Sequence, residues 1–264
     1  MKIGFFDSGI GGLAVLNQAL AVLPKEDYIY YADVDHVPYG TKTKEQIIKF
    51  ADDAVHFLTA HDVKAIVVAC NTATSVAIRY LRDKYRIPIL GVEPAVKTAV
   101  EHNKGGGRVL VIATPLTTRE AKLKNLVTSV DTEKKVDIHP VSGLVTFAEN
   151  GEFDSPAVEA YLKKELEEYN LSDYTELVLG CTHFNYFKDT YSKIFPAGTE
   201  FIEGSVGTVN HLKKILTEKK LLEDNGGSVE YYYSGRRITD GEDKQKIDNL
   251  LSRLEKMRNI TRSE

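Results

Sequence analysis

The sequence predicts an α/β protein of two similar lobes, each a mainly parallel sheet covered by helices, with a functional site in the cleft between them. Three observations support this. Short apolar runs alternate with longer amphipathic stretches, the apolar runs are continuous, and one strand-to-cysteine segment occurs twice. Such alternation is typical of βαβ units, and continuous apolar strands are typical of parallel sheets covered on both faces. A chain of 264 residues accommodates two modest lobes.

Each predicted strand is a short run rich in β-branched and aromatic residues. In chain order these runs are Lys2–Phe6, Tyr28–Tyr31, Ala65–Ala69, Ile87–Gly91, Val109–Ala113, Val136–Pro140, Leu177–Gly180 and Glu200–Ile202. Predicted helices show apolar residues at three- and four-residue spacing. They include Lys44–Ala60, Thr74–Lys84, Thr118–Val127, Ser155–Tyr169 and Val206–Thr217. The charged C-terminal residues Arg253–Glu264 are expected to fray.

An internal sequence repeat indicates the domain organisation. Residues 65–72, Ala-Ile-Val-Val-Ala-Cys-Asn-Thr, resemble residues 176–183, Glu-Leu-Val-Leu-Gly-Cys-Thr-His. Each cysteine also follows an earlier strand, ending near Asp7 or Thr114, at a similar distance. We therefore expect residues 1–96 with 207–264 to form the lobe that carries Cys70, and residues 97–206 to form the lobe that carries Cys181. The second lobe begins near Lys97–Gly107, where the glycines at 105–107 punctuate the chain.

Both cysteines follow predicted strands, and ligands of parallel α/β sheets bind at the carboxyl ends of strands. Facing lobes would place the two thiols on opposite walls of one cleft. The sequence shows no secretory signal and no run of membrane-spanning length, so we expect a cytoplasmic protein with no membrane association and free thiols. A net charge of -4 argues against nucleic-acid binding.

Two thiols suit the inversion of an amino acid's α-carbon, because a proton must leave one face and return to the other. A thiol has a pKa of about 8.5, and this pKa falls at a helix N-terminus. The alternative for each cysteine alone is small core filling. The polar residues that follow them favour a site, since each needs hydrogen-bond partners inside a core: Asn71, Thr72, Thr182 and His183.

Further candidate residues each have a simpler alternative. Asp7 and Ser8 follow the first strand and face the predicted cleft, but they also suit a turn. His183 titrates near neutrality and can transfer a proton, or it can merely neighbour a helix start. Tyr39-Gly40 after Pro38 fits a tight turn equally well. Glu149, from the residues alone, is more typical of a solvated loop.

Six ordered motifs together resemble the glutamate racemases of the aspartate/glutamate racemase family, from Lys2 to about Gly207. They are Asp7–Leu13, Tyr31–Asp33, Pro38–Gly40, Ala69–Thr74, Gly91–Pro94 and Gly180–Phe184. The resemblance implies an isomerase that interconverts L- and D-glutamate without cofactor or metal, supplies D-glutamate for peptidoglycan, cell-wall biogenesis and cell shape, and often forms a homodimer.

The same resemblance implies roles for individual residues. Cys70 and Cys181 would be the two bases, Cys70 acting on D-glutamate and Cys181 on L-glutamate. Asp7 would lie near the first thiol, His183 near the second, and Glu149 would be an active-site carboxylate. Substrate would bind at Asp7, Ser8, Tyr39, Gly40, Asn71, Thr72, Thr182 and His183. Two positions depart from the family pattern, because Thr146 and Asn185 stand where proline is usual.

Other functions fit the sequence less well. Gly9–Ala14 matches G-x-G-x-x-A after a strand, with Asp33 as a ribose-binding carboxylate, which suggests a dinucleotide-dependent oxidoreductase. That hypothesis puts the charge of Asp7 beside the pyrophosphate and leaves both cysteine motifs unexplained. A solute-binding protein would need no thiols, a thiol hydrolase would leave Cys70 idle, and close metal-ligand spacing and a pyridoxal phosphate site are both lacking. An aspartate racemase is the nearest alternative.

Overall fold

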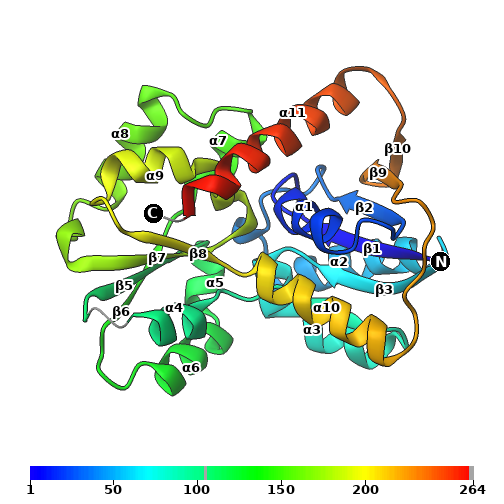
Figure 1. Cartoon of the computed structure of the whole chain (residues 1–264), viewed down its shortest axis with the longest axis horizontal. Helices are drawn as coiled ribbons and strands as arrows, with labels where there is room; N and C mark the ends of the chain where they lie inside the picture. Colours follow the sequence, from blue (N-terminus) through cyan, green and yellow to red (C-terminus); the bar gives the residue numbers. More distant parts are fainter. Residues whose placement is uncertain (104–105, 262–264) are drawn as a thin grey trace.

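The computed structural model describes residues 1–103 and 106–261 and contains two sheets side by side (Figure 1). The six-stranded sheet has the order β10-β9-β2-β1-β3-β4, and the four-stranded sheet has the order β6-β5-β7-β8. Every pair is parallel except β9 with β10. We call the elements around these sheets the first and second lobes. The predicted fold class is confirmed.

The strands follow the predicted apolar runs closely. The first sheet contains β1 (Lys2–Asp7), β2 (Tyr28–Ala32), β3 (Val63–Val68), β4 (Ile89–Gly91), β9 (Val229–Tyr233) and β10 (Arg236–Ile238). The second contains β5 (Arg108–Ala113), β6 (Val136–Pro140), β7 (Tyr174–Gly180) and β8 (Glu200–Glu203). The central strands β1, β3, β5 and β7 are almost wholly buried, as their continuous apolar sequences require.

The internal sequence repeat corresponds to a strand topology that the two sheets share. The order β2-β1-β3-β4 in one sheet corresponds to β6-β5-β7-β8 in the other. Cys70 therefore follows the strand paired with β1, and Cys181 follows the strand paired with β5. Repetition of one topology puts the two cysteines at equivalent places in the two sheets.

Helices cover both sheets. They are α1 (Leu13–Val22), α2 (Lys44–Thr59), α3 (Asn71–Lys84), α4 (Val96–His102), α5 (Pro115–Arg119), α6 (Ala121–Val130), α7 (Gly143–Glu149), α8 (Pro156–Glu165), α9 (Lys188–Ile194), α10 (Ser205–Glu218) and α11 (Gly241–Arg258). Short 3-10 helices are η1 (Tyr39–Thr41), η2 (Leu171–Asp173), η3 (Thr182–Phe187) and η4 (Asn259–Thr261). Thr43 begins α2 with a full capping box, and Ser155 caps α8.

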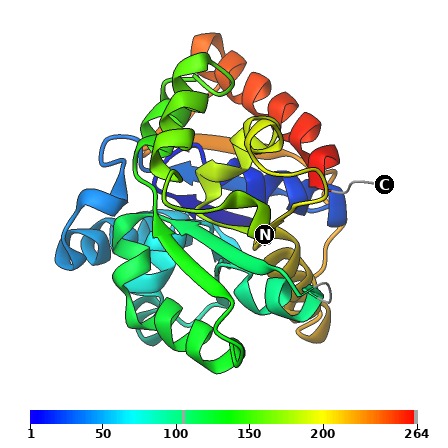
Figure 2. The same cartoon turned by 90° about the vertical axis from the view of Figure 1, so that its left-hand side faces the viewer.

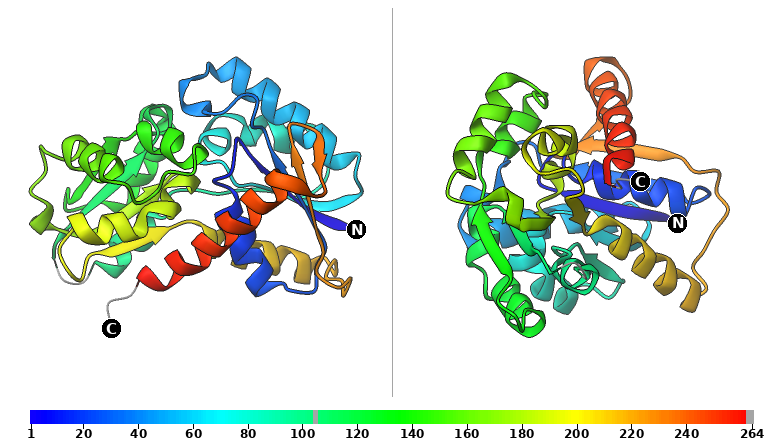
Figure 3. Two further views of the ribbon diagram at one scale, coloured as in Figure 1. Left: turned by 90° about the horizontal axis from the view of Figure 1, so that it is seen from above. Right: turned by 60° about the vertical axis from the view of Figure 1, so that its left-hand side comes forward.

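The chain passes between the lobes twice, from β4 through α4 to β5, and from β8 into α10. Figure 2 looks from the side of the second lobe, whose green elements stand in front of the first. The left view of Figure 3 shows red α11 running obliquely from the first lobe toward the second. One apolar core cluster includes Ile10, Leu110 and Phe184, so the cores of the two lobes are continuous.

Two expectations about elements need correction. Thr118–Val127 is not one helix, because Glu120 is extended (φ -67°, ψ 136°) and separates α5 from α6. Arg253 does not lie in a frayed end: it donates to the carboxylate of Asp189 and to the carbonyl of Tyr186 from within α11. Residues 262–264, and residues 104–105 within the proposed boundary segment, lie outside the described residues.

Some elements were not predicted, among them α1, β9, β10 and α11. In α11 the buried residues Ile247, Leu250, Leu254 and Met257 keep helical spacing, but charged residues surround them. Within residues 1–103 and 106–261, no helix has the length and apolarity needed to span a membrane.

Candidate active site

Cys70 lies between the carboxyl end of β3 and the first turn of α3. Its side chain accepts a hydrogen bond from the backbone N–H of Ala73 (3.4 Å), and its Sγ lies 3.6 Å from Ser8 Oγ. Burial, followed by the nearby charge of Asp7, raises the pKa of the Cys70 thiol to about 12. The sequence predicted a lowered pKa from the helix start alone. That expectation is wrong for this closed site, because desolvation outweighs the helix N–H groups.

Cys181 occupies the equivalent place after β7, but a 3-10 helix follows it instead of an α-helix. Its Sγ lies 3.7 Å from His183 Nδ1, so the imidazole of His183 faces the second thiol. Both cysteines are buried and unbonded to one another. The predicted proximity of His183 to the second thiol is therefore present in the structure.

Glu149 ends α7 and reaches His183 from the other side. Its Oε1 lies 2.7 Å from His183 Nε2 and accepts the backbone N–H of Ile10 (2.9 Å). Burial alone would lower the pKa of His183, but its contacts with Cys181 and Glu149 raise that pKa well above its ordinary value. Burial likewise works against ionisation of Glu149, and the hydrogen bond and charge of His183 lower its pKa overall. The solvated-loop interpretation of Glu149 is wrong.

Asp7 is fully buried at the carboxyl end of β1. Its carboxylate accepts the Gly9 N–H (2.9 Å) and the Thr182 hydroxyl (3.1 Å). Desolvation raises the pKa of this carboxyl, although His183, Gly9 and Thr182 each lower it. Asp7 thus joins the first strand of one lobe to the residue after Cys181 in the other, so its position is fixed relative to both thiols.

One small cavity collects the predicted residues. It has a volume of about 10 Å³ and is lined by Ser8, Pro38, Tyr39, Gly40, Cys70, Asn71, Thr72, Thr114, Val145, Cys181, Thr182 and His183. Both cysteines and most predicted substrate-binding residues therefore face one space. Asp7 and Glu149 lie behind this lining and act on it through Thr182 and His183. The lining residues include no lysine or arginine.

The turn at Tyr39-Gly40 is held by Asp33. The Tyr39 hydroxyl donates to Asp33 Oδ2 (2.6 Å), and Ser234 Oγ and His36 Nδ1 also contact this carboxylate (3.2 and 2.9 Å). Asp33, considered above as a ribose-binding carboxylate, instead fixes the turn that lines the cavity.

Several lining residues were missed from the sequence. Thr114, at the end of β5, contacts the Thr72 hydroxyl of the opposite lobe (3.0 Å), and Thr117 completes this hydroxyl cluster (3.3 Å from Thr72). Thr114 occupies the place in the second lobe that Asp7 occupies in the first. The internal sequence repeat therefore pointed to Thr114 as a candidate site residue. Val145 gave no sequence signal.

The two departures from the family pattern leave the site intact. Asn185 is buried and its amide donates to the carbonyl of Thr182 (3.1 Å). Thr146 lies within α7 without displacing Glu149 from His183.

The glycine loop 9–12 is packed against side chains. A Cβ on Gly11 would lie 2.5 Å from His183 Nδ1, and one on Gly12 would lie 2.5 Å from Asp7 Cβ. The space a dinucleotide pyrophosphate needs is therefore occupied by the second lobe and by Asp7. Among residues 1–103 and 106–261, no group of three His, Cys, Asp or Glu side chains is arranged to hold a metal ion.

Comparison with known proteins decides the family. A profile described as Asp/Glu/Hydantoin racemase matches residues 12–211. The chain belongs to this racemase family. It is 53% identical to a glutamate racemase of Lachnospira eligens, over 98% of this chain and 100% of that protein. It is 47% identical to glutamate racemase 2 of Bacillus subtilis, over 97% of both proteins.

Solved structures of related racemases have the same fold. A glutamate racemase from Francisella tularensis, in complex with D-glutamate, matches with a TM-score of 0.78 and 32% identity, covering 95% of this chain and 93% of that one. A glutamate racemase isoform from Bacillus anthracis matches with a TM-score of 0.77 and 32% identity, covering 87% and 86%. This chain carries one thiol in each lobe, Cys70 in the first and Cys181 in the second.

Proposed function

We propose that this protein is a glutamate racemase that interconverts L- and D-glutamate by two-thiol proton transfer, without a cofactor, and supplies D-glutamate for peptidoglycan. The single observation that carries the proposal is the cavity shared by Cys70 and Cys181, because each thiol comes from an equivalent strand of a different lobe. The names of full-length relatives support glutamate as the substrate, and the family profile supports racemisation.

The reaction needs one base and one acid at a time. In the L-to-D direction, the Cys181 thiolate removes the α-proton and becomes a thiol. The Cys70 thiol then gives its proton to the opposite face of the carbanion and becomes a thiolate. The raised pKa of Cys70 keeps that thiol protonated and ready to donate in this direction. The reverse reaction exchanges the two roles.

His183 and Glu149 serve the second thiol. His183 Nδ1 lies 3.7 Å from Cys181 Sγ, so the imidazole is placed to hydrogen-bond to the sulfur that exchanges the α-proton. Glu149 favours the protonated imidazole and fixes its ring orientation through Nε2. Asp7 has a matching place near the first thiol, where its charge opposes ionisation of Cys70.

The substrate carboxylates are held by neutral donors. Hydroxyls and amides of Ser8, Asn71, Thr72 and Thr182 face the cavity, and Tyr39-Gly40 forms its edge. The cavity also lies at the N-terminus of α3, where the helix dipole favours an anion. A site of buried donors rejects substrates that leave those donors unpaired, so the spacing of the two carboxylates selects glutamate over aspartate.

Substrate entry needs the lobes to separate. The cavity of about 10 Å³ has room for roughly one water molecule. Glutamate is far larger, and the lining comes from both lobes. We infer that the structure represents a closed state and that opening between the lobes admits substrate.

Three further expectations belong to this proposal. The division of the chain into residues 1–96 with 207–264 and residues 97–206 is supported by the two separate sheets. The buried free thiols suit a reducing compartment, which supports a cytoplasmic location. A homodimer is the expectation from family resemblance, and sedimentation analysis tests it.

A chiral assay tests the function directly. Purified protein that has been dialysed against a chelator is expected to interconvert D- and L-glutamate with no added cofactor. Its rate should equal that of the protein before dialysis. Aspartate, glutamine and alanine are expected to react far more slowly. A dependence on pyridoxal phosphate would contradict the mechanism, and an equal or faster rate with aspartate would move the assignment to aspartate racemase.

A further inference from the structure

Lys246 of α11 is a cation close to the candidate active site that the two-thiol mechanism does not use. It is half-buried, and its Nζ donates to the backbone carbonyl of Glu149 (3.0 Å). Lys244, two residues earlier, instead forms an ion pair with Asp248 of its own helix (2.7 Å). The ammonium of Lys246 is therefore directed at the backbone of α7.

The carbonyl that Lys246 contacts lies at the end of a helix. Glu149 is the last residue of α7, and the last four carbonyls of an α-helix have no partner within that helix. A lysine ammonium can satisfy such a carbonyl, and the helix dipole favours a positive charge there. Lys246 thus caps α7, although it lies 97 residues later in the chain.

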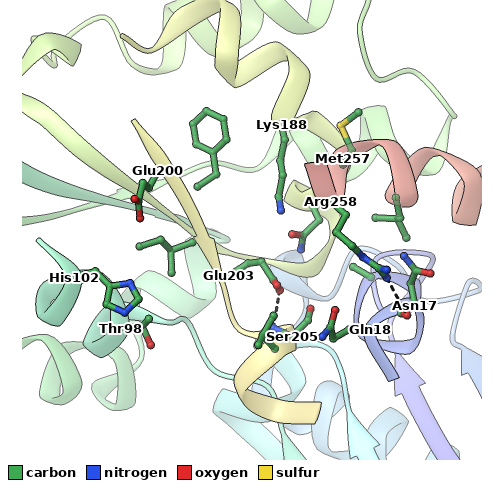
Figure 4. A pocket seen from close by; sticks show the side chains of 16 residues that line it. Asn17, Gln18, Thr98, His102, Lys188, Glu200, Glu203, Ser205, Met257 and Arg258 are labelled. Carbon is green, nitrogen blue, oxygen red and sulfur yellow. Dashed lines mark hydrogen bonds between the residues drawn. The ribbon is translucent and has the colours of Figure 1, made fainter. Parts of the chain in front are cut away.

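The contacts of α11 fix the place of this cap. Arg253, about two helical turns after Lys246 and on the same face, donates to both carboxylate oxygens of Asp189 in α9 (2.9 and 2.8 Å). At the end of α11, Arg258 donates to the carbonyl of Asn17 in α1 (3.2 Å), as Figure 4 shows. Because α11 is held by elements of both lobes, it presents Lys246 to α7 from a fixed position.

The carboxylate of Glu149 has two contacts that tolerate little movement. Its Oε1 lies 2.7 Å from His183 Nε2 and accepts the N–H of Ile10 (2.9 Å). A separation of about 3.6 Å is no longer a hydrogen bond, so a shift of Glu149 by about 1 Å away from these partners would break both contacts. Burial opposes ionisation of Glu149, whereas His183, Ile10 and Lys246 each lower its pKa. Glu149 and His183 therefore connect Lys246 to Cys181.

We propose that Lys246 is a positioning residue of this enzyme: by capping the last carbonyl of α7, it holds the Glu149 carboxylate against His183 and so supports proton transfer at Cys181. The effect on turnover rests on the proposed function, whereas the effect on the His183 imidazole rests on the contacts alone. Lys246 does not line the cavity shared by the thiols, so its loss should leave substrate binding largely intact.

Substitutions in α11 test this role by kinetics. The variant is Lys246→Met, the conservative variant is Lys246→Arg, and the matched control is Lys256→Met, an exposed lysine of the same helix. In Lys246→Met, kcat should fall about tenfold or more in both directions while KM changes less than about twofold, because a misplacement of about 1 Å slows catalysis more than it weakens binding. Lys246→Arg keeps a charged donor and should recover most of the lost kcat. Lys256→Met should match the parent.

A double-mutant cycle tests whether Lys246 acts through the Glu149 carboxylate. In a Glu149→Gln protein, the added substitution Lys246→Met should lower kcat by less than about twofold, because no charged carboxylate remains to be positioned. Losses that multiply in the double variant would show that Lys246 acts by another route and would overturn the inference.

NMR of protein with isotope-labelled histidine gives a readout that does not depend on turnover. The imidazole signals of His183 are assigned by their absence in His183→Gln. In Lys246→Met they should move toward their positions in Glu149→Gln, and in Lys256→Met they should stay at the parent positions. If Lys246→Met fails to fold, Lys246→Gln takes its place in each measurement.

The combined results separate positioning from a purely structural role. Lower stability to urea in Lys246→Met, with the kcat and the His183 signals of the parent, would show that Lys246 only caps α7 and would overturn the inference. A fall in kcat with unmoved His183 signals would also overturn it. Absence of glutamate racemisation by the parent would overturn the proposed function, and the His183 signals would still decide whether Lys246 positions Glu149.

Discussion

The two thiols occupy equivalent positions but different environments. Cys70 faces Ser8 and the negative charge of Asp7, whereas Cys181 faces His183. This asymmetry arises from the residues that follow each cysteine and from opposite-lobe contacts, because the strands themselves are alike. Each thiol therefore has different neighbours, and burial and the charge of Asp7 raise the pKa of Cys70.

The raised pKa of Cys70 predicts slow alkylation. In a Cys181→Ser protein, which leaves Cys70 as the single thiol, reaction with iodoacetamide should be slow at pH 8 and should accelerate as pH rises toward about 12, because thiolate is the nucleophile. Mass spectrometry of the modified peptide measures the rate, and the urea-unfolded protein is the reference. A folded protein that reacts as fast as the unfolded one at pH 8 would refute the assigned environment.

Glu149→Gln tests the link to His183. Loss of the carboxylate lowers the pKa of His183, so the protonated imidazole is lost at lower pH and the alkaline limb of the kcat/KM profile shifts downward. We expect kcat/KM to fall about 100-fold or more in both directions, since the two enantiomers are equally stable. The matched control is Asp154→Asn, an exposed residue of the following loop. An unchanged pH profile in Glu149→Gln would separate Glu149 from the chemistry.

At the scale of elements, the loop from Asp7 to Gly12 connects strand β1 to the residues that follow the second thiol. The hydroxyls of Tyr30 and Tyr186 hold its carbonyls at Gly9 and Ile10 (2.7 and 3.0 Å). Its glycines allow Thr182 and His183 of the second lobe to approach the backbone.

Gly11→Ala tests this close approach. The new methyl group would lie 2.5 Å from His183 Nδ1 and 2.6 Å from Thr182 Oγ1, so it must displace both. We expect a loss of about 1–3 kcal/mol in the free energy of unfolding and a large loss of activity. Urea unfolding and the chiral assay measure these effects. The control is Gly207→Ala, where nothing lies within 4 Å of the new methyl and helix α10 should gain about 0.5–1 kcal/mol. Full activity in Gly11→Ala would contradict the packing described.

Sequence patterns predicted the central strands and the location of both cysteines at the ends of strands. Continuous apolar runs and a repeated motif are local signals that the sequence shows directly. The break between α5 and α6 and the strands that were not predicted depend on tertiary contacts, which the local sequence does not show. Glu120 interrupts a good helical pattern, and the strands β9 and β10 depend on pairing beside distant β2. Glu149 could be placed only by resemblance, since its partners His183 and Ile10 come from remote segments. Thr114 could have been predicted from the repeated segment, because Thr114 stands in the second lobe where Asp7 stands in the first.

For the whole molecule, the cavity of about 10 Å³ is too small for glutamate, and on this ground we infer that the lobes open during turnover. On the α2 side, an ion pair joins Lys44 of α2 to Glu120 before α6 (2.8 Å). Such a partly exposed pair contributes little stability by itself, so it does not prevent opening.

Covalent closure across this ion pair should stop turnover. A carbodiimide couples adjacent amines and carboxylates, so it should link Lys44 to Glu120 and hold the lobes closed. Peptide mapping identifies the linked fraction, and the chiral assay should show activity lost in proportion to it. Lys44→Met protein, treated identically, controls for other carboxylate modification. Retention of full activity by linked protein would show that substrate enters without separation of these elements.

The most direct test of the two-thiol account is hydrogen exchange at the α-carbon in deuterated water with single cysteine variants. With the parent protein, the product enantiomer should carry deuterium while recovered substrate gains it more slowly, because the second thiol delivers a solvent-derived hydron. Cys70→Ala and Cys181→Ala should each abolish inversion, since both cysteines line the one cavity and the transfer needs both. NMR and chiral chromatography should show that any remaining exchange is confined to D-glutamate when Cys70 is intact and to L-glutamate when Cys181 is intact. Full racemisation by either variant would show that one base suffices and would contradict the mechanism.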